Sequence, residues 1–225
     1  AAFAALPTAD PPAAATELER TVSRHGFKGG IVNGHTEGRY LDDRRFWPVL
    51  EAAEALGVPI YLHPATPPAP VVEACYAGFS PFVSFTLSNS AWGWHVDTGL
   101  HVLRLVLAGA FDRFPRLQLV VGHLGEALPF MLARTSNRLP PEATGLPRTI
   151  EEYVREHVHL SISGFFTVPP FLNALLELGA DRLLFSVDHP FSPNGEGRAF
   201  LDALPISRAD REKIAHGNAE RLLRL

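Results

Sequence analysis

The segment Leu119-Val120-Val121-Gly122-His123-Leu124-Gly125-Glu126 joins a short apolar run directly to a histidine and a carboxylate. Two other segments are built in a similar way, Ile60-Tyr61-Leu62-His63 and Leu183-Leu184-Phe185-Ser186-Val187-Asp188-His189-Pro190. Short apolar runs bounded by turn residues are typical of buried parallel strands. If all three are parallel strands, His63, His123 and Asp188 leave the same end of one sheet, where barrel enzymes carry their active sites.

Candidate strands alternate with candidate helices along the chain, as in a parallel sheet covered by helices. Besides the runs that end at His63, His123 and Asp188, strands are predicted over 2–6, 29–33 and 158–163. Helices are predicted over 13–25, 44–56, 97–111, 128–139, 150–157, 170–178, 207–216 and 218–225, with Asn218 as the N-cap of the last. The pattern predicts an α/β fold of barrel type.

The number of strands bears on how much of a barrel is present. A (β/α)8 TIM barrel has eight strands and typically ~250 residues, whereas six strands are predicted here. We therefore expect a single domain over residues 1–225 that lacks the first two strand-helix units and forms the C-terminal portion of a longer protein. Such a fragment is expected to bind metal weakly and to leave its barrel open.

One stretch, about 64–94, has no clear period and is rich in Pro, Phe, Ser and Trp. Irregular segments of this length in a compact domain are usually functional, so a lid-like loop is predicted. Its aromatic residues fit two roles equally well, covering a flat substrate ring or forming a subunit interface. They include Phe82, Phe85, Trp92 and Trp94.

Composition narrows the class of protein. The chain has 20 Lys and Arg against 24 Asp and Glu, a net charge of -4, so a basic nucleic-acid groove is not expected. The single cysteine, Cys75, excludes an intrachain disulfide and a thiol metal site and favours a reducing compartment. No apolar run approaches the ~18 residues of a membrane span, and the first residues lack a basic leader. We expect a cytoplasmic protein with no membrane contact.

Each residue at a strand end is open to a functional and a structural interpretation. His63, followed by Pro64, is equally consistent with a metal ligand and with a histidine that bonds a loop carbonyl. Glu126 is placed to orient His123 as a proton-transfer residue, the alternative being a carboxylate that complements a helix dipole. Asp188 follows a mainly apolar run, which favours a metal ligand or proton donor over a helix N-cap. His35, just after the strand that ends at Asn33, is an even choice for substrate contact.

These segments together carry a family resemblance. Tyr61-Leu62-His63-Pro64, Gly122-His123-Leu124-Gly125-Glu126, Phe185-Ser186-Val187-Asp188-His189-Pro190 and Gly217-Asn218-Ala219-Glu220-Arg221-Leu222-Leu223 resemble the amidohydrolase-related decarboxylases. That group includes aminocarboxymuconate-semialdehyde, resorcylate and dihydroxybenzoate decarboxylases. The resemblance extends over nearly the whole chain, and Asn33-Gly34, 111–115 and Arg134 are similar to positions in the resorcylate branch.

The resemblance implies roles for individual residues. His63 and Asp188 would bind a divalent metal, zinc or manganese, while His123 would be catalytic with Glu126 orienting it. Arg134 would help to hold the substrate, and we add Asn33, His35 and Trp92 as substrate-contact candidates. The family completes its metal site with a Glu-x-His or His-x-His pair on the first strand. No such pair precedes His63, so only two of the usual three protein ligands of a catalytic zinc are present.

Three functions follow from this reading. The first is a metal-dependent non-oxidative decarboxylase acting on a hydroxy-aromatic or unsaturated carboxylic acid and releasing CO2. The second is a metal-assisted hydrolase of a lactone or amide on the same fold, and the third is an inactive scaffold. We expect a small carboxylic acid as the substrate and a homo-oligomer, dimer or tetramer, as the assembly.

Overall fold

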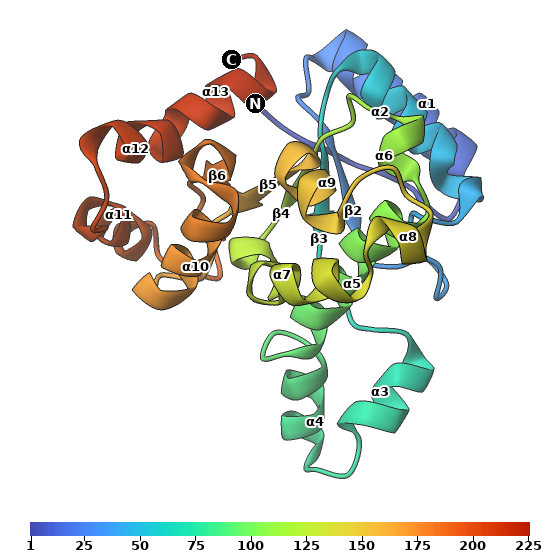
Figure 1. Cartoon of the computed structure of the whole chain (residues 1–225), viewed down its shortest axis with the longest axis horizontal. Helices are drawn as coiled ribbons and strands as arrows, with labels where there is room; N and C mark the ends of the chain where they lie inside the picture. Colours follow the sequence, from blue (N-terminus) through green and yellow to red (C-terminus); the bar gives the residue numbers. More distant parts are fainter. The chain divides into compact units, whose positions relative to one another are not determined.

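The computed structural model describes residues 1–225, which form two compact units, 1–117 and 118–225. Each unit consists of parallel strands with helices packed around them (Figure 1). A single domain over residues 1–225 stays a prediction. No helix of either unit combines the length and the apolar character needed to cross a membrane.

Unit 1 contains three parallel strands in chain order: β1 (Ala4–Ala5), β2 (Gly30–Asn33) and β3 (Ile60–His63). Ile60 and Leu62 of β3 are completely buried. The register pairs Gly30 with Ile60 and Asn33 with His63. Asn33 and His63 therefore end two neighbouring strands at the same edge.

The helices of unit 1 cover these strands. The first is entered through Asp10, whose carboxylate accepts a hydrogen bond from the Ala13 amide at 3.1 Å, and ends at Gly26 in the left-handed conformation. The helices of unit 1 are α1 (Pro11–His25), η1 (Arg44–Phe46), α2 (Trp47–Leu56), α3 (Ala69–Tyr76), α4 (Pro81–Ser88), α5 (Gly93–Leu107) and α6 (Ala110–Arg113).

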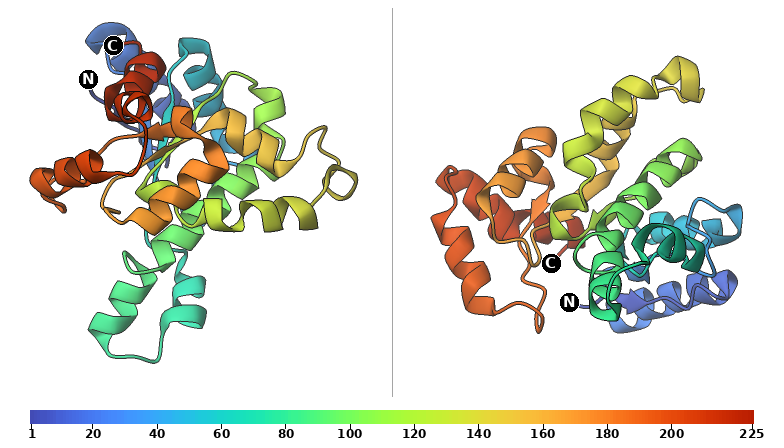
Figure 2. Two further views of the ribbon diagram at one scale, coloured as in Figure 1. Left: turned by 60° about the vertical axis from the view of Figure 1, so that its left-hand side comes forward. Right: turned by 90° about the horizontal axis from the view of Figure 1, so that it is seen from below.

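The stretch predicted as a long irregular loop is mostly helical. It folds into α3 and α4, which form a hairpin that projects from the rest of unit 1 (Figures 1 and 2). Each helix begins with a proline in its first turn, a position that favours helix initiation. Eight residues span barely two turns, so no 3.6-residue period could emerge from the sequence. A role as a lid stays a prediction.

Unit 2 also contains three parallel strands: β4 (Leu119–Val121), β5 (Val158–Ser161) and β6 (Leu183–Leu184). Every residue of these strands is buried. All six predicted strands are thus confirmed, although every one except β3 is shorter than predicted. Regular pairing stops at Val121 and Leu184, and the residues that follow turn away to form the candidate site.

The predicted helices of unit 2 form close to their expected positions, but α8 and the ten-residue α11 were not predicted. α9 starts with a complete capping box between Thr149 and Glu152. The helices are η2 (His123–Gly125), α7 (Leu128–Arg138), α8 (Pro141–Thr144), α9 (Ile150–His157), α10 (Val168–Leu178), η3 (Ala180–Arg182), α11 (Asn194–Ala203), α12 (Arg208–Glu212), the π-helical η4 (Lys213–Gly217) and α13 (Asn218–Leu223).

Asn218 has a different role from the predicted N-cap. It has helical backbone angles, and its completely buried side chain donates hydrogen bonds to the carbonyls of Ala180 and Leu183, both at 2.7 Å. The backbone runs on from η4 into α13 without the extended residue that a cap needs. Asn218 therefore links the C-terminal helix α13 by hydrogen bonds to η3 and to the first residue of β6.

Candidate functional site

A left-handed turn directly after β4 carries the first two site residues. His123, Leu124, Gly125, Glu126 and Ala127 all have φ between +46° and +88°. A single non-glycine residue with positive φ is uncommon, and such conformations cluster at functional sites because they cost free energy. The turn brings the His123 and Glu126 side chains onto the same side of the backbone.

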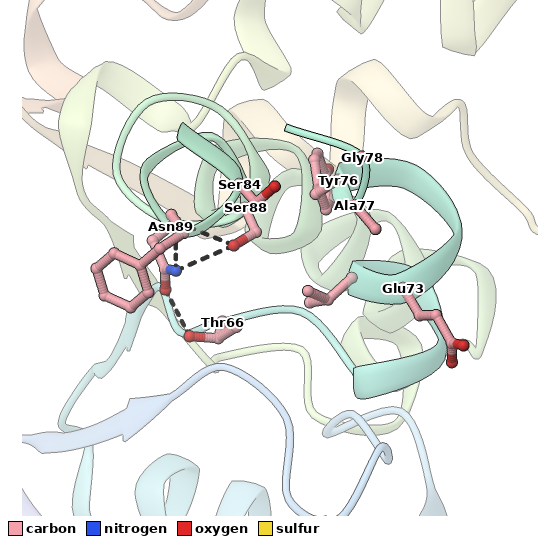
Figure 3. A pocket seen from close by; sticks show the side chains of 10 residues that line it. Thr66, Glu73, Tyr76, Ala77, Gly78, Ser84, Ser88 and Asn89 are labelled. Carbon is pink, nitrogen blue, oxygen red and sulfur yellow. Dashed lines mark hydrogen bonds between the residues drawn. The ribbon is translucent and has the colours of Figure 1, made fainter. Parts of the chain in front are cut away.

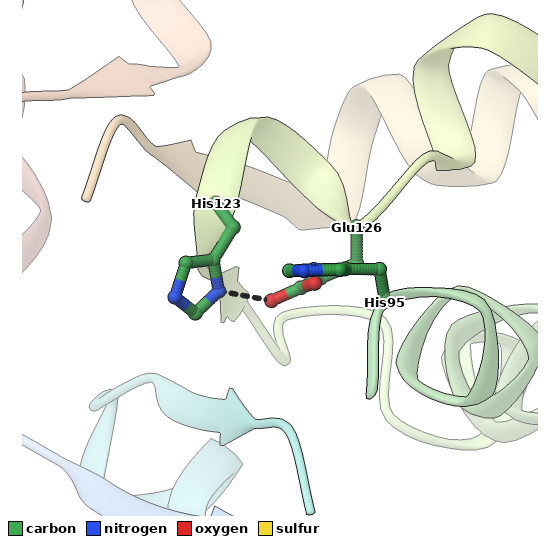
Figure 4. Close-up of side chains that lie close together, drawn as sticks. All are labelled: His95, His123 and Glu126. Carbon is green, nitrogen blue, oxygen red and sulfur yellow. Dashed lines mark hydrogen bonds and ion pairs between the residues drawn. The ribbon is translucent and has the colours of Figure 1, made fainter. Parts of the chain in front are cut away.

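Glu126 holds His123 by a short hydrogen bond, 2.5 Å between Glu126 Oε1 and His123 Nδ1 (Figure 4). The Glu126 side chain is fully buried, and His123 is one-tenth exposed. A carboxylate in this position accepts the Nδ1 proton, so the neutral ring carries its lone pair on Nε2. The pair predicted from the sequence is therefore formed, and the helix-dipole alternative does not account for this bond.

Serine side chains from the neighbouring strands support the turn. The His123 amide donates to Ser163 Oγ at 3.3 Å, and Ser163 Oγ lies 3.0 Å from Ser161 Oγ. The Ser163 amide in turn donates to Ser186 Oγ at 3.2 Å. These contacts link the residues that follow β4, β5 and β6.

Asp188 faces the open side of the imidazole. Its Oδ2 lies 3.9 Å from His123 Nε2, beyond hydrogen-bond distance, and its side chain is 30% exposed. Asp188 also has a left-handed backbone, with φ of +71°. A Cβ built on Gly164 would lie 3.5 Å from Asp188 Oδ2 and 3.6 Å from His123 Cδ2, so this glycine borders both groups. His123 Nε2, a proton acceptor, and the Asp188 carboxylate therefore border the same small space.

His63, in unit 1, has the hydrogen bonding expected of an imidazole ligand. Its Nδ1 donates to the Pro64 carbonyl at 2.8 Å, which places the lone pair on Nε2. Metal-binding histidines usually donate their other nitrogen to a carbonyl or carboxylate in this way. The His63 imidazole is a donor type that fits a zinc ion.

The substrate-contact candidates lie on different elements. Asn33 is exposed at the end of β2, beside His63 in the register. His35 is half-buried in the segment after β2, and Trp92 is half-exposed just before α5. Arg134 is exposed on α7. Their contacts with a substrate stay predictions.

Two groups of residues were missed by sequence reasoning. Serines 161, 163 and 186 gave no signal, because serine is common and their meeting depends on strand register. Asp97 and His101 gave a signal that was overlooked, since two ionisable residues four apart share one face of a mainly apolar helix. Both are buried in unit 1, where burial lowers the pKa of His101 to about 3.

Comparisons with known proteins match the chain along its whole length. The model of the amidohydrolase family matches residues 1–225. The decarboxylase orsB of Emericella nidulans is 39% identical, covering 100% of this chain and 70% of that protein. The gamma-resorcylate decarboxylase of Polaromonas sp. is also 39% identical, covering 99% and 70% respectively.

A solved structure agrees with these matches. The dihydroxybenzoic acid decarboxylase of Polaromonas sp., crystallised with manganese and the inhibitor 2-nitroresorcinol, has a TM-score of 0.91 and 38% identity, covering 99% of this chain and 68% of that one. The predicted α/β fold class and the resemblance stated from the motifs are confirmed.

Proposed function

The chain belongs to the amidohydrolase family, and we propose that it catalyses the metal-dependent, non-oxidative decarboxylation of a hydroxy-aromatic or unsaturated carboxylic acid. The observation that carries this proposal is the Glu126–His123 pair, which faces the Asp188 carboxylate across 3.9 Å. Names of the relatives, gamma-resorcylate decarboxylase among them, support the reaction class.

We propose His63 and Asp188 as metal ligands, with manganese favoured by the ion in the Polaromonas structure. A bound divalent ion would supply positive charge that attracts the substrate carboxylate and a neighbouring hydroxyl. The family resemblance calls for a further pair of ligands, which this chain does not contain before His63.

The residues of unit 2 divide the proton transfers between them. Asp188 in its protonated form delivers a proton to the carbon that bears the carboxyl group, and the bond from that carbon to the carboxyl carbon breaks to release CO2. His123 Nε2 takes up or shares the proton of the substrate hydroxyl. Glu126 stabilises the positive charge that develops on His123.

The proposed substrate contacts are made by the exposed residues Asn33, Trp92 and Arg134. The guanidinium of Arg134 suits a carboxylate, because its planar N–H donors match two carboxylate oxygens. Asn33 can bond a hydroxyl group, and Trp92 can stack on a flat ring. His35 is not included, because its Nδ1 accepts a hydrogen bond from the Gly38 amide and its Nε2 is buried.

The test is turnover of 2,6-dihydroxybenzoate by the purified protein supplied with manganese or zinc. In D2O, one deuterium should enter the ring at the carbon that loses CO2, and CO2 and resorcinol should form in equal amounts. The Asp188→Asn variant should lose turnover; CO2 release at the wild-type rate would contradict its role as proton donor.

Two other outcomes separate the competing functions. Acid release from lactones without CO2 release from hydroxybenzoates would favour hydrolysis on the same fold. A protein that neither retains stoichiometric metal nor responds to added zinc or manganese would favour a non-catalytic scaffold.

We also propose that the chain forms a homo-oligomer through the α3–α4 hairpin. Phe79, Phe82 and Phe85 are 60%, 77% and 67% exposed, and Glu73 is the only charged residue between 64 and 94. An exposed aromatic surface with almost no charge can pack against the same surface of a second copy of the chain, because no like charges repel each other there. A hollow of about 330 Å³ between α3 and α4, bordered by Val72, Tyr76 and Asn89, is large enough to receive a phenyl ring (Figure 3).

Light scattering tests this assembly. The double variant Phe82→Ser, Phe85→Ser should shift the protein towards monomer, whereas Phe130→Ser, equally exposed at 78% but on α7, should not. An unchanged mass for the double variant would contradict the proposed interface.

We also infer a cytoplasmic location, supported by the unpaired, exposed thiol of Cys75.

A further inference from the structure

Unit 1 contains a buried polar cluster formed by His35, Tyr40, Asp97 and His101. Asp97 and His101 lie one turn apart on α5, with 7% and 0% of their surface exposed. Tyr40 is at the centre of the cluster: its hydroxyl donates to Asp97 Oδ1 at 2.5 Å, and its ring meets the rings of His35 and His101 edge-on at 6.0 and 4.9 Å. The cluster joins the segment after β2 to the middle of α5.

Backbone amides fix the tautomers of the two histidines. The Leu41 amide donates to His101 Nε2 at 2.8 Å, and the Gly38 amide donates to His35 Nδ1 at 3.0 Å. A ring nitrogen that accepts a hydrogen bond carries a lone pair, so the hydrogen of the neutral ring sits on the other nitrogen. His101 therefore presents an N–H at Nδ1, and His35 presents one at Nε2.

Three buried atoms of the cluster lack a hydrogen-bond partner within the protein: His101 Nδ1, His35 Nε2 and Asp97 Oδ2. Two are donors and the third is an acceptor. Buried polar atoms of native proteins are nearly always satisfied, and where protein groups do not reach them an ordered water does so. A water molecule, with two lone pairs and two hydrogens, matches this set of three atoms.

We propose that these residues hold one buried water molecule, which accepts hydrogen bonds from His101 Nδ1–H and His35 Nε2–H and donates one to Asp97 Oδ2. A metal ion does not suit the cluster, because both imidazoles present hydrogens instead of lone pairs towards it. Burial keeps His101 neutral, in agreement with this arrangement.

The water would fix the position of the chain where it leaves β2. His35 and Tyr40 belong to the segment that follows Asn33, and Asn33 is the register partner of His63. Binding both ends of this segment to α5 holds the edge at which Asn33 and His63 end. The inference rests on hydrogen bonding within unit 1 and does not depend on the proposed reaction.

Two measurements on the unmodified protein test the proposal. A crystal structure at about 1.8 Å or better should show one isolated density peak within hydrogen-bond distance of the three atoms. Nitrogen-15 NMR should find the Nδ1–H tautomer for His101 and the Nε2–H tautomer for His35. The opposite tautomer in either ring, an anomalous signal from a metal at the peak, or a direct His35–Asp97 bond without a peak would overturn it.

A matched pair of variants tests whether the cluster holds the segment. Tyr40→Phe removes the bond to Asp97, whereas Tyr76→Phe removes a hydroxyl of equal burial, 7% against 8% exposed, that the proposed bonding does not use. Hydrogen exchange at the Gly38 and Leu41 amides should accelerate about tenfold in Tyr40→Phe, as loss of one hydrogen bond predicts, and stay near wild type in Tyr76→Phe. Equal exchange in the two variants would contradict this role.

Discussion

The buried carboxylate of Glu126 decides how His123 can exchange protons. Because it occupies Nδ1, it leaves Nε2 as the nitrogen that faces Asp188. This pair was predictable from the sequence, since a glycine directly precedes each of a histidine and a glutamate that are three residues apart. The supporting contacts of Ser163 and Ser186 were not, because they depend on how three strands are placed side by side.

A conservative substitution separates the charge of Glu126 from its shape. Glu126→Gln keeps an oxygen that can accept the Nδ1 proton but removes the negative charge that stabilises a protonated ring. We expect kcat to fall roughly 10- to 100-fold with little change in KM. Steady-state kinetics check this, with the exposed Glu142→Gln in the same unit as the control. A wild-type kcat would show that the charge takes no part in turnover.

At the level of secondary structure, short elements were predictable where a strand is a buried apolar run or where a helix is bounded by residues that start or end helices. The apolar run Leu119–Val121 predicted its strand correctly, and the helix over 150–157 was predicted with its observed bounds. The α3–α4 hairpin was missed because its helices are too short to show a period. Asn218 was misassigned because its partners, the carbonyls at 180 and 183, lie far away in sequence. The glycines of the segment after β4 indicated a sharp turn, but they did not predict left-handed backbone angles at its other residues.

That turn can be tested through a matched pair of glycines in unit 2. Gly125 and Gly145 have φ of +88° and +72°, so alanine is strained at both. At Gly125 the added Cβ would also lie 2.9 Å from Leu160 Cδ2 and from Pro129 Cδ, whereas nothing lies within 4 Å at Gly145. We expect a loss of about 1 kcal/mol for Gly145→Ala and a further ~1–3 kcal/mol for Gly125→Ala.

Urea unfolding measures this difference, and activity adds a second readout. Gly125→Ala should also lower kcat, because it displaces the backbone between His123 and Glu126. Equal stability losses for the two alanine variants would contradict the close packing of Gly125 against Leu160 and Pro129.

For the molecule as a whole, each unit contains a histidine that folding keeps uncharged. Burial, with a contribution from neighbouring arginines, lowers the pKa of His101 in unit 1 and of His159 in unit 2 to about 3, from an ordinary value of 6.5. Below pH 6.5 the unfolded chain binds protons at both positions and the folded chain does not. The stabilisation is therefore complete above pH 6.5 and is lost as the pH falls towards 3.

Acidification from pH 6.5 to 5 should lower the free energy of unfolding by up to about 1.4 kcal/mol per pH unit for each histidine. Carboxylates with lowered pKa values, such as Asp43 and Glu152, lose their stabilisation only below about pH 4.5, so they contribute little in this window. Asp97 acts in the opposite direction, because burial raises its pKa and its protonation then favours the folded state. Urea midpoints across this window should fall less steeply in His101→Gln and His159→Gln, while the exposed His216→Gln keeps the wild-type slope. An unchanged slope in both buried variants would mean that neither ring is held neutral by folding.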